Sequence, residues 1–427
     1  MTVIGIDDTD SRTAGMCTTY AGARLVERVE DAGGRVERAL LVRLNPAVEH
    51  KTRGNGAVAI HCTLPPDRAF ELAEDALSLA VEGERTSPGG VVWSGSLTDL
   101  PAAAMNFSRA AIHEELAIAD AARIFDRPGF RATGRQKGRG RIGALAAVGA
   151  WAAFEAEWDW SYECLSYRPP DRWGTDRVVD EASVFSAAAE AYPTVWDTVD
   201  RAAGEAVCVP HTPGPVLYGI RGDEPDAVCA VADAIDGEPV ARRQLYVTNQ
   251  GTDAHLQSAM VSEVVNGGAY RLTATVTVPP ETREGGHVFF TVGEESTTGE
   301  ADLRCVAFEP TKRFRDQVRA LRVGDRVTVC GEVGDGTLKL EKFALREPVQ
   351  AELVTPDCPE CGRSMSSAGR AAGYRCRDCG TTAPGRVERP LDRAIEPGWY
   401  EVPPRARRHV ARPLIRGGFD APTHPER

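Results

Sequence analysis

Lysine is almost absent from this chain of 427 residues. The five lysines stand at positions 51, 137, 312, 339 and 342, so arginine supplies nearly all of the positive charge. The net charge of −12 would ordinarily argue against a nucleic-acid partner, but low lysine with excess acid is typical of proteins adapted to high salt, in which surface carboxylates maintain solubility. Local clusters of basic residues, at 131–141, 312–322 and 403–416, are therefore more informative than the total.

Long apolar segments are also missing. No run approaches the roughly 18 to 20 apolar residues that span a bilayer, and the N-terminus lacks the basic region and apolar core of a secretory signal. We therefore expect a cytoplasmic protein with no membrane partner. The length predicts about three domains, and an apolar content of 42% is sufficient for ordinary cores.

The apolar pattern divides the chain into units of different type. The first 125 or so residues alternate short strands with helical stretches, which indicates an α/β or α+β domain. In a second α+β unit, near 130–262, "GALAAVGAWAAF" fits a helix or a strand, and residues 214–249 follow the order strand, helix, strand, which suits a ferredoxin-like unit. From residue 268 onward, five strands with a helix before the fourth predict an OB barrel.

Three aspartates follow the first predicted strand, in "IDDTDS". Such a run is also typical of a turn or a helix N-cap, because its side chains bind nearby backbone N–H groups. However, the carboxylates of Asp7 and Asp8 are adjacent and repel each other. A hard cation such as Mg²⁺, which binds one or two carboxylates together with phosphate oxygens, relieves that repulsion. The run suggests a nucleotide site whose phosphate-binding half lies elsewhere.

Two glycine-rich basic segments are candidates for that half: "KTRGNG" (Lys51 to Gly56) and "KGRGRIGA" (Lys137 to Ala144). Glycine lets backbone N–H groups approach an anion, and the cations neutralise it. Neither has P-loop spacing, so each could be an ordinary turn. Together with the aspartates they supply complementary halves of a site for ATP and Mg²⁺.

The predicted barrel carries aromatic and basic residues together, a mixture used to bind single-stranded nucleic acid. They are Phe289, Phe290, Phe308, Lys312, Arg313 and Arg315. Alternation along the strands requires that some of these rings belong to the core. The basic tail "PPRARRHVARPLIR", which includes Arg408, is either a solvated surface or a further contact for phosphate.

Four of the eleven cysteines form a regular cluster: Cys358 and Cys361, then Cys376 and Cys379. Two CxxC pairs separated by fourteen residues are typical of a zinc ribbon in which four thiolates hold one structural Zn²⁺. The other cysteines are scattered, as in a reducing compartment.

These motifs, taken in order, resemble the archaeal tRNA-Ile 2-agmatinylcytidine synthetases. The resemblance rests on "GIDDTDS", "GMCTTY", "KTRGNGAV", "KGRGRIGALAAVGA", "TPGPVLYGIRG", "GGHVFF", "AFEPTKRFR", the paired CxxC and "PGWYEVPPRARRHVARPLIR", and it extends over essentially the whole chain. It implies a multidomain α+β protein with four units: a kinase-like ATP-binding α/β domain at 1–128, a ferredoxin-like domain at 129–262, an OB-fold barrel at 263–348, and a zinc ribbon with a basic tail at 349–427.

The resemblance also implies a reaction. ATP activates the C2 carbonyl oxygen of the wobble cytidine in the CAU anticodon of tRNA-Ile, and the amine of agmatine displaces the phosphate. The modified base then pairs with adenosine and reads AUA. The family phosphorylates itself on the first threonine of MCTTY, which is Thr18 in this sequence. No protein partner is implied.

The resemblance assigns roles to individual residues. Asp7 and Asp8 hold Mg²⁺, Thr18 faces the γ-phosphate, and Arg139 stabilises the charge that develops on transfer. The remaining residues of the nucleotide-binding site are Thr9, Asp10, Lys51, Arg53, Gly54, Asn55, Lys137, Gly138, Gly140 and Gly143. For the substrates we predict contacts of Asp223 with the agmatine guanidinium, and of Phe289, Phe308, Lys312, Arg315 and Arg408 with RNA.

Two other functions fit the same predicted domains and motifs. One is an ATP-dependent RNA kinase or ligase that does not use agmatine. The other is a single-strand-binding protein built from an OB fold and a zinc ribbon. Binding alone does not need adjacent aspartates and two glycine-rich basic loops, whereas dependence on agmatine separates the first alternative from the synthetase.

Overall fold

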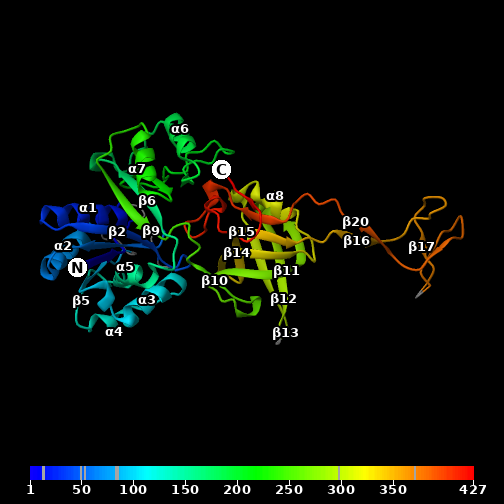
Figure 1. Cartoon of the computed structure of the whole chain (residues 1–427), viewed down its shortest axis with the longest axis horizontal. Helices are drawn as coiled ribbons and strands as arrows, with labels where there is room; N and C mark the ends of the chain where they lie inside the picture. The colour runs from blue at the N-terminus through cyan, green and yellow to red at the C-terminus, as the bar shows by residue number, and fades with distance from the viewer. Residues whose placement is uncertain (12–14, 49–50, 52–53, 82–85, 297–298, 370–371) are drawn as a thin grey trace.

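The computed structural model describes the whole chain except residues 12–14, 49–50, 52–53, 82–85, 297–298 and 370–371. Figure 1 shows two α/β halves, a barrel beside them, and a small unit at the end of an extended stalk. Within the described ranges, every helix is too short or too polar to cross a membrane.

One sheet of nine strands runs through both α/β halves, in the order β5-β4-β1-β3-β2-β9-β6-β8-β7. Its strands are β1 (Thr2–Asp7), β2 (Val36–Arg43), β3 (Gly56–Cys62), β4 (Gly89–Ser94), β5 (Phe130–Gly134), β6 (Ser161–Tyr167), β7 (Val195–Trp196), β8 (Val216–Gly222) and β9 (Arg242–Thr248). The halves meet where β2 and β9 pair in parallel, with Leu40 opposite Val247 and Leu41 opposite Thr248.

Helices cover this sheet on both faces. They are α1 (Thr18–Asp31), α2 (Pro66–Leu77), α3 (Ala102–His113), α4 (Ile118–Phe125), α5 (Arg141–Phe154), α6 (Glu181–Ala191) and α7 (Pro225–Ala234). Side chains of a strand alternate between its faces. Ile4 and Ile6 accordingly join the core under α1 and α2, whereas Val3 joins the core under α3 and α5. The predicted buried first strand is confirmed as β1.

The segment that fitted either a helix or a strand is helix α5, and it lies directly on β1. A Cβ atom at Gly5 would stand 2.2 Å from the carbonyl oxygen of Ala144, so only glycine permits this approach. The contact places the first turn of α5 beside the end of β1. β5 and α5 follow the predicted boundary at 128/129, yet they pack on the first half. That boundary remains a prediction.

The predicted barrel is confirmed. Its strands are β11 (Ala269–Thr282), β12 (Val288–Ser296), β13 (Gly299–Ala307), β14 (Arg326–Gly334) and β15 (Thr337–Glu347), and α8 (Phe314–Arg319) precedes the fourth. The barrel closes because β13 pairs with β15 and β14 pairs with both β11 and β15. The short strand β10 (Leu256–Ser258) pairs in parallel with the first residues of β11.

The predicted last unit, 349–427, has two parts in space. A stalk of β16 (Ala351–Val354) and β20 (Val387–Pro390) carries a small sheet of β17 (Ser366–Ser367), β18 (Tyr374–Arg375) and β19 (Thr382–Ala383). The chain then returns to the barrel, where β21 (Gly398–Glu401) pairs with β15 and β22 (Thr423–His424) pairs with β21. Figure 1 shows the stalk carrying the small sheet away from the barrel.

Candidate active site

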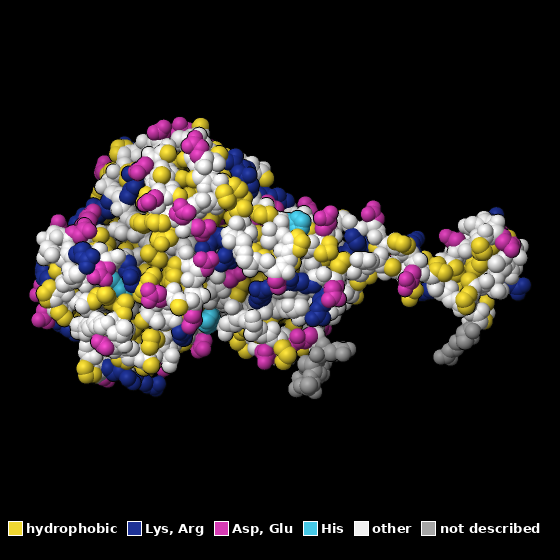
Figure 2. All heavy atoms as spheres, in the orientation of Figure 1, with side chains coloured by type: hydrophobic (Ala, Val, Ile, Leu, Met, Phe, Trp, Pro, Cys, Tyr) yellow, Lys and Arg dark blue, Asp and Glu magenta, His cyan; other side chains and the backbone are white. Residues whose placement is uncertain are grey.

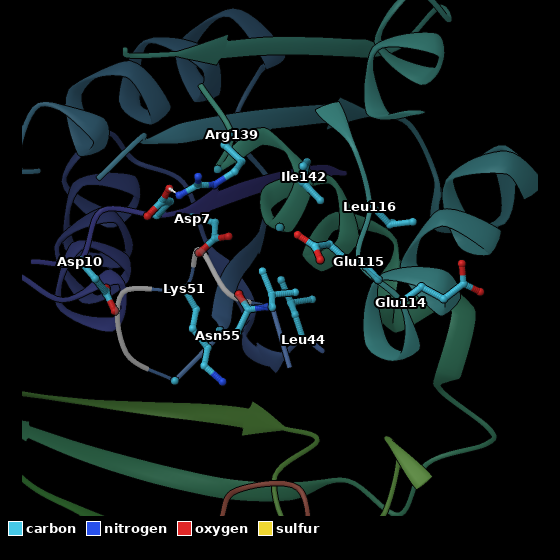
Figure 3. Close-up of a pocket in the computed structure, with 17 residues that line it drawn as sticks. Asp7, Asp10, Leu44, Lys51, Asn55, Glu114, Glu115, Leu116, Arg139 and Ile142 are labelled. Carbon is cyan, nitrogen blue, oxygen red and sulfur yellow. Dashed lines mark hydrogen bonds and ion pairs between the residues drawn. The ribbon is translucent and has the colours of Figure 1, made fainter. Parts of the chain in front are cut away.

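A cavity of about 110 Å³ opens where β1 ends and α5 begins. The end of β1 supplies Asp7, Asp8 and Asp10, and the segment before β3 supplies Lys51 and residues 54–56. Further lining comes from Leu44, Val48, Ala111, Glu114, Glu115, Leu116, Arg139, Gly140, Ile142 and Gly143. Figure 3 shows the acidic end of β1 facing Arg139 and the linker between α3 and α4 on the opposite side. The structure thus brings together the aspartates and parts of both glycine-rich segments.

Asp8 is fixed by contacts from two distant segments. Its Oδ2 accepts a hydrogen bond of 3.1 Å from the backbone N–H of Ser87 and forms an ion pair of 3.3 Å with Nη2 of Arg139. Asp8 has a φ of +55°, a left-handed conformation that is uncommon outside glycine, asparagine and aspartate. A residue held in such a conformation is consistent with a functional constraint on its carboxylate.

The two adjacent carboxyl groups both resist ionisation. Burial and the neighbouring Asp8 raise the pKa of Asp7 well above its usual range. Burial also raises the pKa of Asp8 to about 6, against the lowering effect of Arg139. Two carboxylates crowded in this way provide the hard oxygen ligands that a divalent cation binds.

The N-terminal end of α5 is pressed against Asp7. A Cβ atom at Gly143 would lie 1.9 Å from Oδ2 of Asp7, and one at Gly140 would lie 2.5 Å from its carbonyl oxygen. Gly138 has a φ of +56°, which glycine adopts without strain. The N-terminal end of a helix carries partial positive charge, although the N–H groups of Arg141 and Ile142 already donate to the carbonyl oxygens of Gly138 and Arg139, at 3.2 and 2.9 Å. The cavity therefore offers a helix terminus of positive potential next to two carboxylates that suit a cation.

Thr18 lies beside the cavity at the start of α1 and is only 2% exposed. Its hydroxyl accepts a hydrogen bond of 3.3 Å from the backbone N–H of Thr9 and donates one of 2.7 Å to Oδ1 of Asp10. The carboxylate of Asp10 also accepts the backbone N–H of Thr18. These bonds tie the acidic segment to α1, and the role of Thr18 in phosphoryl transfer stays a prediction.

Only some of the other predicted nucleotide-binding residues line the cavity. Lys51, Gly54 and Asn55 line the cavity, where Lys51 donates to the carbonyl of Pro46 and Asn55 donates to that of Asn45 at 2.9 Å. Lys137 and Gly138 precede the lining residues of α5 and do not themselves line the cavity in the described part of the chain. Arg53 lies outside the described residues.

Sequence reasoning missed one wall of the cavity. Leu44, Val48, Leu116 and Ile142 form it, together with Glu115 from the linker between α3 and α4. In Figure 3 the carboxylate of Glu115 points into the cavity on the side facing Asp7. The only sequence signal here was an acidic pair followed by leucine after a helix, which ordinary surface loops also contain.

Asp223 follows the last residue of β8 and contacts the C-terminal segment. Its Oδ1 accepts a hydrogen bond of 2.6 Å from Nε of Arg416 and a longer one of 3.4 Å from Nε1 of Trp196. Asp223 is therefore already paired with a guanidinium, and it is not among the described residues that line the cavity. Its predicted contact with agmatine stays a prediction.

The barrel aromatics divide between surface and core. Phe290 is 2% exposed and belongs to the core, as alternation required, whereas Phe289 and Phe308 are half-buried. The guanidinium groups of Arg283 and Arg304 lie 4.8 and 5.5 Å from the ring centroid of Phe289. Phe289 thus has the half-exposed, cation-flanked setting that stacking on a base requires.

The predicted RNA-binding cations have acidic neighbours. Lys312 and Arg315 both pair with Glu309, and Arg408 pairs with Glu332 and with Glu341 at 2.8 Å. Figure 2 shows basic and acidic side chains interspersed over the visible face. Any phosphate that binds Arg408 competes with two carboxylates.

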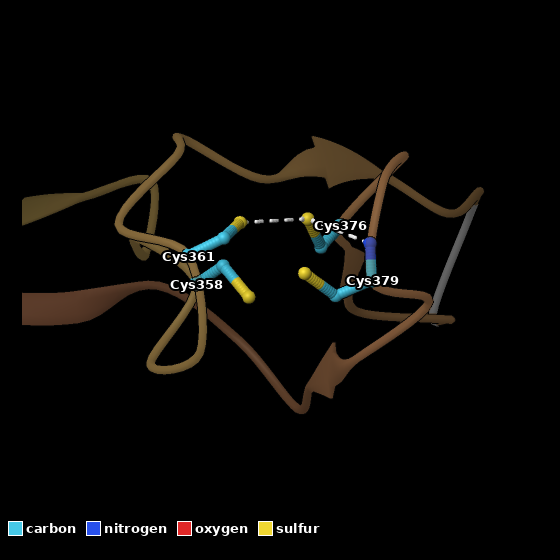
Figure 4. A group of neighbouring side chains, drawn as sticks. All are labelled: Cys358, Cys361, Cys376 and Cys379. Carbon is cyan, nitrogen blue, oxygen red and sulfur yellow. Dashed lines mark hydrogen bonds between the residues drawn. The ribbon is translucent and has the colours of Figure 1, made fainter.

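The four ribbon cysteines converge on one point, as Figure 4 shows. Their sulfur atoms all lie within 4.8 Å of one another, and those of Cys361 and Cys376 are 3.6 Å apart. Zn–S bonds of about 2.3 Å in a tetrahedron give sulfur–sulfur distances of about 3.8 Å. The residues therefore fit a structural zinc ion, which the four thiolates would fully coordinate.

Fold and site together define a modular protein that combines a cavity suited to a metal-bound polyphosphate with a barrel and a zinc ribbon. Three family models match the chain: the TiaS TCKD domain over 3–136, the TiaS FLD domain over 138–255, and the TiaS C-terminal zinc ribbon domain over 355–395.

The similarity to known proteins extends over essentially the whole chain. The 2-agmatinylcytidine synthetase TiaS of Haloquadratum walsbyi, which acts on an isoleucine tRNA, is 51% identical, with 100% of both chains covered, and that of Methanosarcina mazei is 45% identical over 97% of each. A crystal structure of TiaS in complex with an isoleucine tRNA and ATP matches at 40% identity with a TM-score of 0.87, and one of TiaS with that tRNA, AMPCPP and agmatine matches at 38% with 0.85. Each match covers 100% of this chain and 99% of the other. The chain belongs to the TiaS family of tRNA 2-agmatinylcytidine synthetases, as its motifs predicted.

Proposed function

We propose that this chain uses ATP to join agmatine to C2 of the wobble cytidine in the CAU anticodon of tRNA-Ile. The product, 2-agmatinylcytidine, pairs with adenosine, so the tRNA reads AUA as isoleucine. The reaction forms a carbon–nitrogen bond, which makes the enzyme a ligase. The observation that supports this most strongly is the cavity in which adjacent aspartates meet the start of α5, in a chain that is similar to its relatives from end to end.

The chemistry explains why ATP is needed. A cytosine carbonyl oxygen is a poor leaving group until it is phosphorylated. Transfer of a phosphoryl group to O2 makes this oxygen part of a phosphate group. That phosphate leaves when the unprotonated amine of agmatine attacks C2. Catalysis of such a transfer consists mainly of positioning and charge stabilisation. We assign these tasks to Arg139 and to the positive potential of the N-terminal end of α5.

Asp7 and Asp8 fit a magnesium site. They offer adjacent hard oxygen ligands whose pKa values are raised chiefly by burial. Mg²⁺ would neutralise charge on the phosphates when bound. Thr9 and Asp10 complete this shell in our proposal. For Thr18 to accept a phosphoryl group, its hydroxyl has to leave its bonds to Thr9 and Asp10.

The second half and the barrel would hold the other substrates. The two contacts of Asp223 both use Oδ1, so Oδ2 is the atom we assign to the agmatine guanidinium. The target base has to leave the anticodon stack to reach the cavity, as base-modifying enzymes require. We assign stacking on the remaining RNA to Phe289 and Phe308, and phosphate contacts to Lys312, Arg315 and Arg408.

The test is incorporation of labelled agmatine into a tRNA-Ile transcript with a CAU anticodon. We expect incorporation that requires ATP and is lost when the wobble cytidine is replaced by uridine. ATP consumption with phosphorylated or joined RNA, but no agmatine in it, would instead support a kinase or ligase that does not use agmatine. Tight binding of the transcript without ATP turnover would support a single-strand-binding protein.

A further inference from the structure

The second α/β half carries a group of aspartates at one end of its strands. The start of β6 and the ends of β8 and β9 meet there, because β6 is antiparallel to both, with Tyr162 opposite Gly222 and Ser161 opposite Thr248. The short strand β7 pairs with the last residues of β8. The aspartates next to these strand ends are Asp159, Asp197, Asp200, Asp223 and Asp253.

Each of these aspartates forms an ion pair with a cation of the barrel or of the C-terminal segment that follows it. The pairs are Arg412 with Asp159 (2.8 Å), Arg407 with Asp197 (2.5 Å), Arg313 with Asp200 (3.2 Å), Arg416 with Asp223 (2.6 Å) and Lys342 with Asp253 (2.5 Å). All five carboxylates belong to one side of this junction and all five cations to the other. Figure 1 shows the C-terminal segment, drawn in red, between the second half and the barrel.

Two of the cations are buried at the junction and have partners in more than one unit. Lys342, from strand β15 of the barrel, is 1% exposed and also donates to the carbonyl oxygen of Arg412 at 3.0 Å. Arg407 binds Asp197 and also pairs with Glu401 of β21 at 2.8 Å. Buried charges are screened by salt much less than surface charges, and a buried charge that loses its partner is strongly unfavourable. These pairs therefore favour a single arrangement of the two units.

We propose that the five ion pairs form a clamp that positions the barrel, and the RNA bound to it, relative to the active-site cavity, with Lys342 and Arg407 as positioning residues. This inference rests on the proposed function, because it concerns the placement of the RNA substrate. Units of one chain usually move relative to each other unless a large apolar interface joins them. None of the ten residues is among the described residues that line the cavity. The clamp acts on the reaction through the orientation of the barrel, which determines whether the wobble base arrives within reacting distance.

The test compares Asp253→Asn with Asp420→Asn, because each variant removes one ion-paired carboxylate without changing its size. Asp253 pairs across the junction, whereas Asp420 pairs with Arg346 at 2.9 Å within the barrel and its attached C-terminal strands. Asparagine tolerates the φ of +62° at position 253. Asp253→Asn should lower kcat for agmatine incorporation at saturating tRNA by about 100-fold, the cost of a displacement of about 1 Å. It should also increase the radius of gyration in solution scattering.

Two binding measurements separate positioning from folding. Calorimetry with AMPCPP and filter binding of the tRNA should give the same affinities for the unsubstituted chain, Asp253→Asn and Asp420→Asn, and Asp420→Asn should keep its kcat. Lys342→Met should lower kcat as Asp253→Asn does. Because both variants remove the same pair, their combination should lower kcat little further. If Lys342→Met does not fold, Asp253→Asn alone carries the test.

Four results would overturn the assignment. The first is an undiminished kcat in Asp253→Asn. The second is an equal loss of kcat in Asp420→Asn, and the third is a loss of AMPCPP binding in parallel with kcat. The fourth is weaker tRNA binding with unchanged kcat, which would show that the cations of the junction contact RNA phosphates instead. Scattering and AMPCPP binding do not depend on agmatine transfer, so a failure of the clamp can be distinguished from a failure of the proposed function.

Discussion

The Nη2 atom of Arg139 lies 3.3 Å from Oδ2 of Asp8, although the two residues are 131 positions apart in the chain. The contact exists because Gly5, Gly140 and Gly143 let the start of α5 approach the end of β1 without a side chain between them. It joins the acidic run to one of the two basic glycine-rich segments. The active site therefore depends on backbone packing as much as on its charged groups.

The raised pKa of Asp8 leads to a prediction about stability. Its carboxyl titrates near pH 6 in the folded chain, above its usual value of 3.8. The folded state therefore holds the proton more tightly, and the stability it gains from this is lost as the pH rises through about 6. At pH 7.5 without Mg²⁺, Asp8→Asn should raise the melting temperature by a few degrees, on the order of 3 °C, and the gain should vanish at pH 4.

Differential scanning fluorimetry at both pH values measures this effect. The exposed Asp67→Asn serves as the control. Mg²⁺ should stabilise the unsubstituted chain at pH 7.5 and not Asp8→Asn. A lower melting temperature of Asp8→Asn in metal-free buffer at pH 7.5 would contradict the account.

Gly143 should be intolerant of any side chain. In Gly143→Ala the new methyl group would meet Oδ2 of Asp7 at 1.9 Å, so the carboxylate or the helix has to shift by more than an ångström. Misplacement of that size costs on the order of 100-fold in rate. We expect kcat/KM for agmatine incorporation to fall accordingly, whereas Gly385→Ala, at a position with open space around it, should leave the rate unchanged. A decrease of less than twofold in Gly143→Ala would contradict the packing argument.

Phe289 and Phe290 should respond differently to substitution. Phe289→Ala removes a half-exposed ring and should weaken tRNA binding by roughly tenfold, because stacking on one base contributes about 1 to 3 kcal/mol. Phe290→Ala empties a core position and should destabilise the barrel by about 3 to 5 kcal/mol. Filter binding and thermal unfolding separate the two effects. Unchanged tRNA affinity in Phe289→Ala would remove this ring from the RNA-binding surface.

The ribbon should hold one zinc ion per chain and lose it without unfolding the rest. Cys379→Ser removes one of four thiolates from a site at the end of a stalk. We expect the bound zinc to fall below half of the unsubstituted amount in elemental analysis, with the main melting transition unchanged. Cys229→Ser, in the second half, should keep its zinc. Full zinc content in Cys379→Ser would show that the four cysteines do not act as one site.

Sequence patterns reveal groups that are close along the chain. The structure confirms three predictions of this kind. They are the strand that ends at Asp7, the five strands and helix of the barrel, and the paired CxxC motifs. The apolar and small-residue pattern of α5 did not distinguish a helix from a strand, because both can be fully buried. The contact of this helix with Gly5 is visible only in the three-dimensional structure.

Contacts between distant segments were not predictable in the same way. Leu116 and Glu115 lie in the linker between α3 and α4, which carries no motif, so both were missed. The arginines of the C-terminal tail looked like a phosphate-binding surface, but Arg407 and Arg416 are buried and paired with Asp197 and Asp223. A charge run shows that partners are needed, and only the fold shows whether the protein itself supplies them.

The most direct test of the central claim compares the unsubstituted chain with Asp8→Asn in the agmatine incorporation assay, at high salt with ATP and Mg²⁺. We predict ATP-dependent labelling of tRNA-Ile by the unsubstituted chain and its loss in Asp8→Asn, with tRNA binding retained by both. Undiminished labelling by Asp8→Asn would contradict the assignment of the acidic run as the catalytic metal site. Consumption of ATP by the unsubstituted chain with no agmatine in the RNA would contradict the reaction itself.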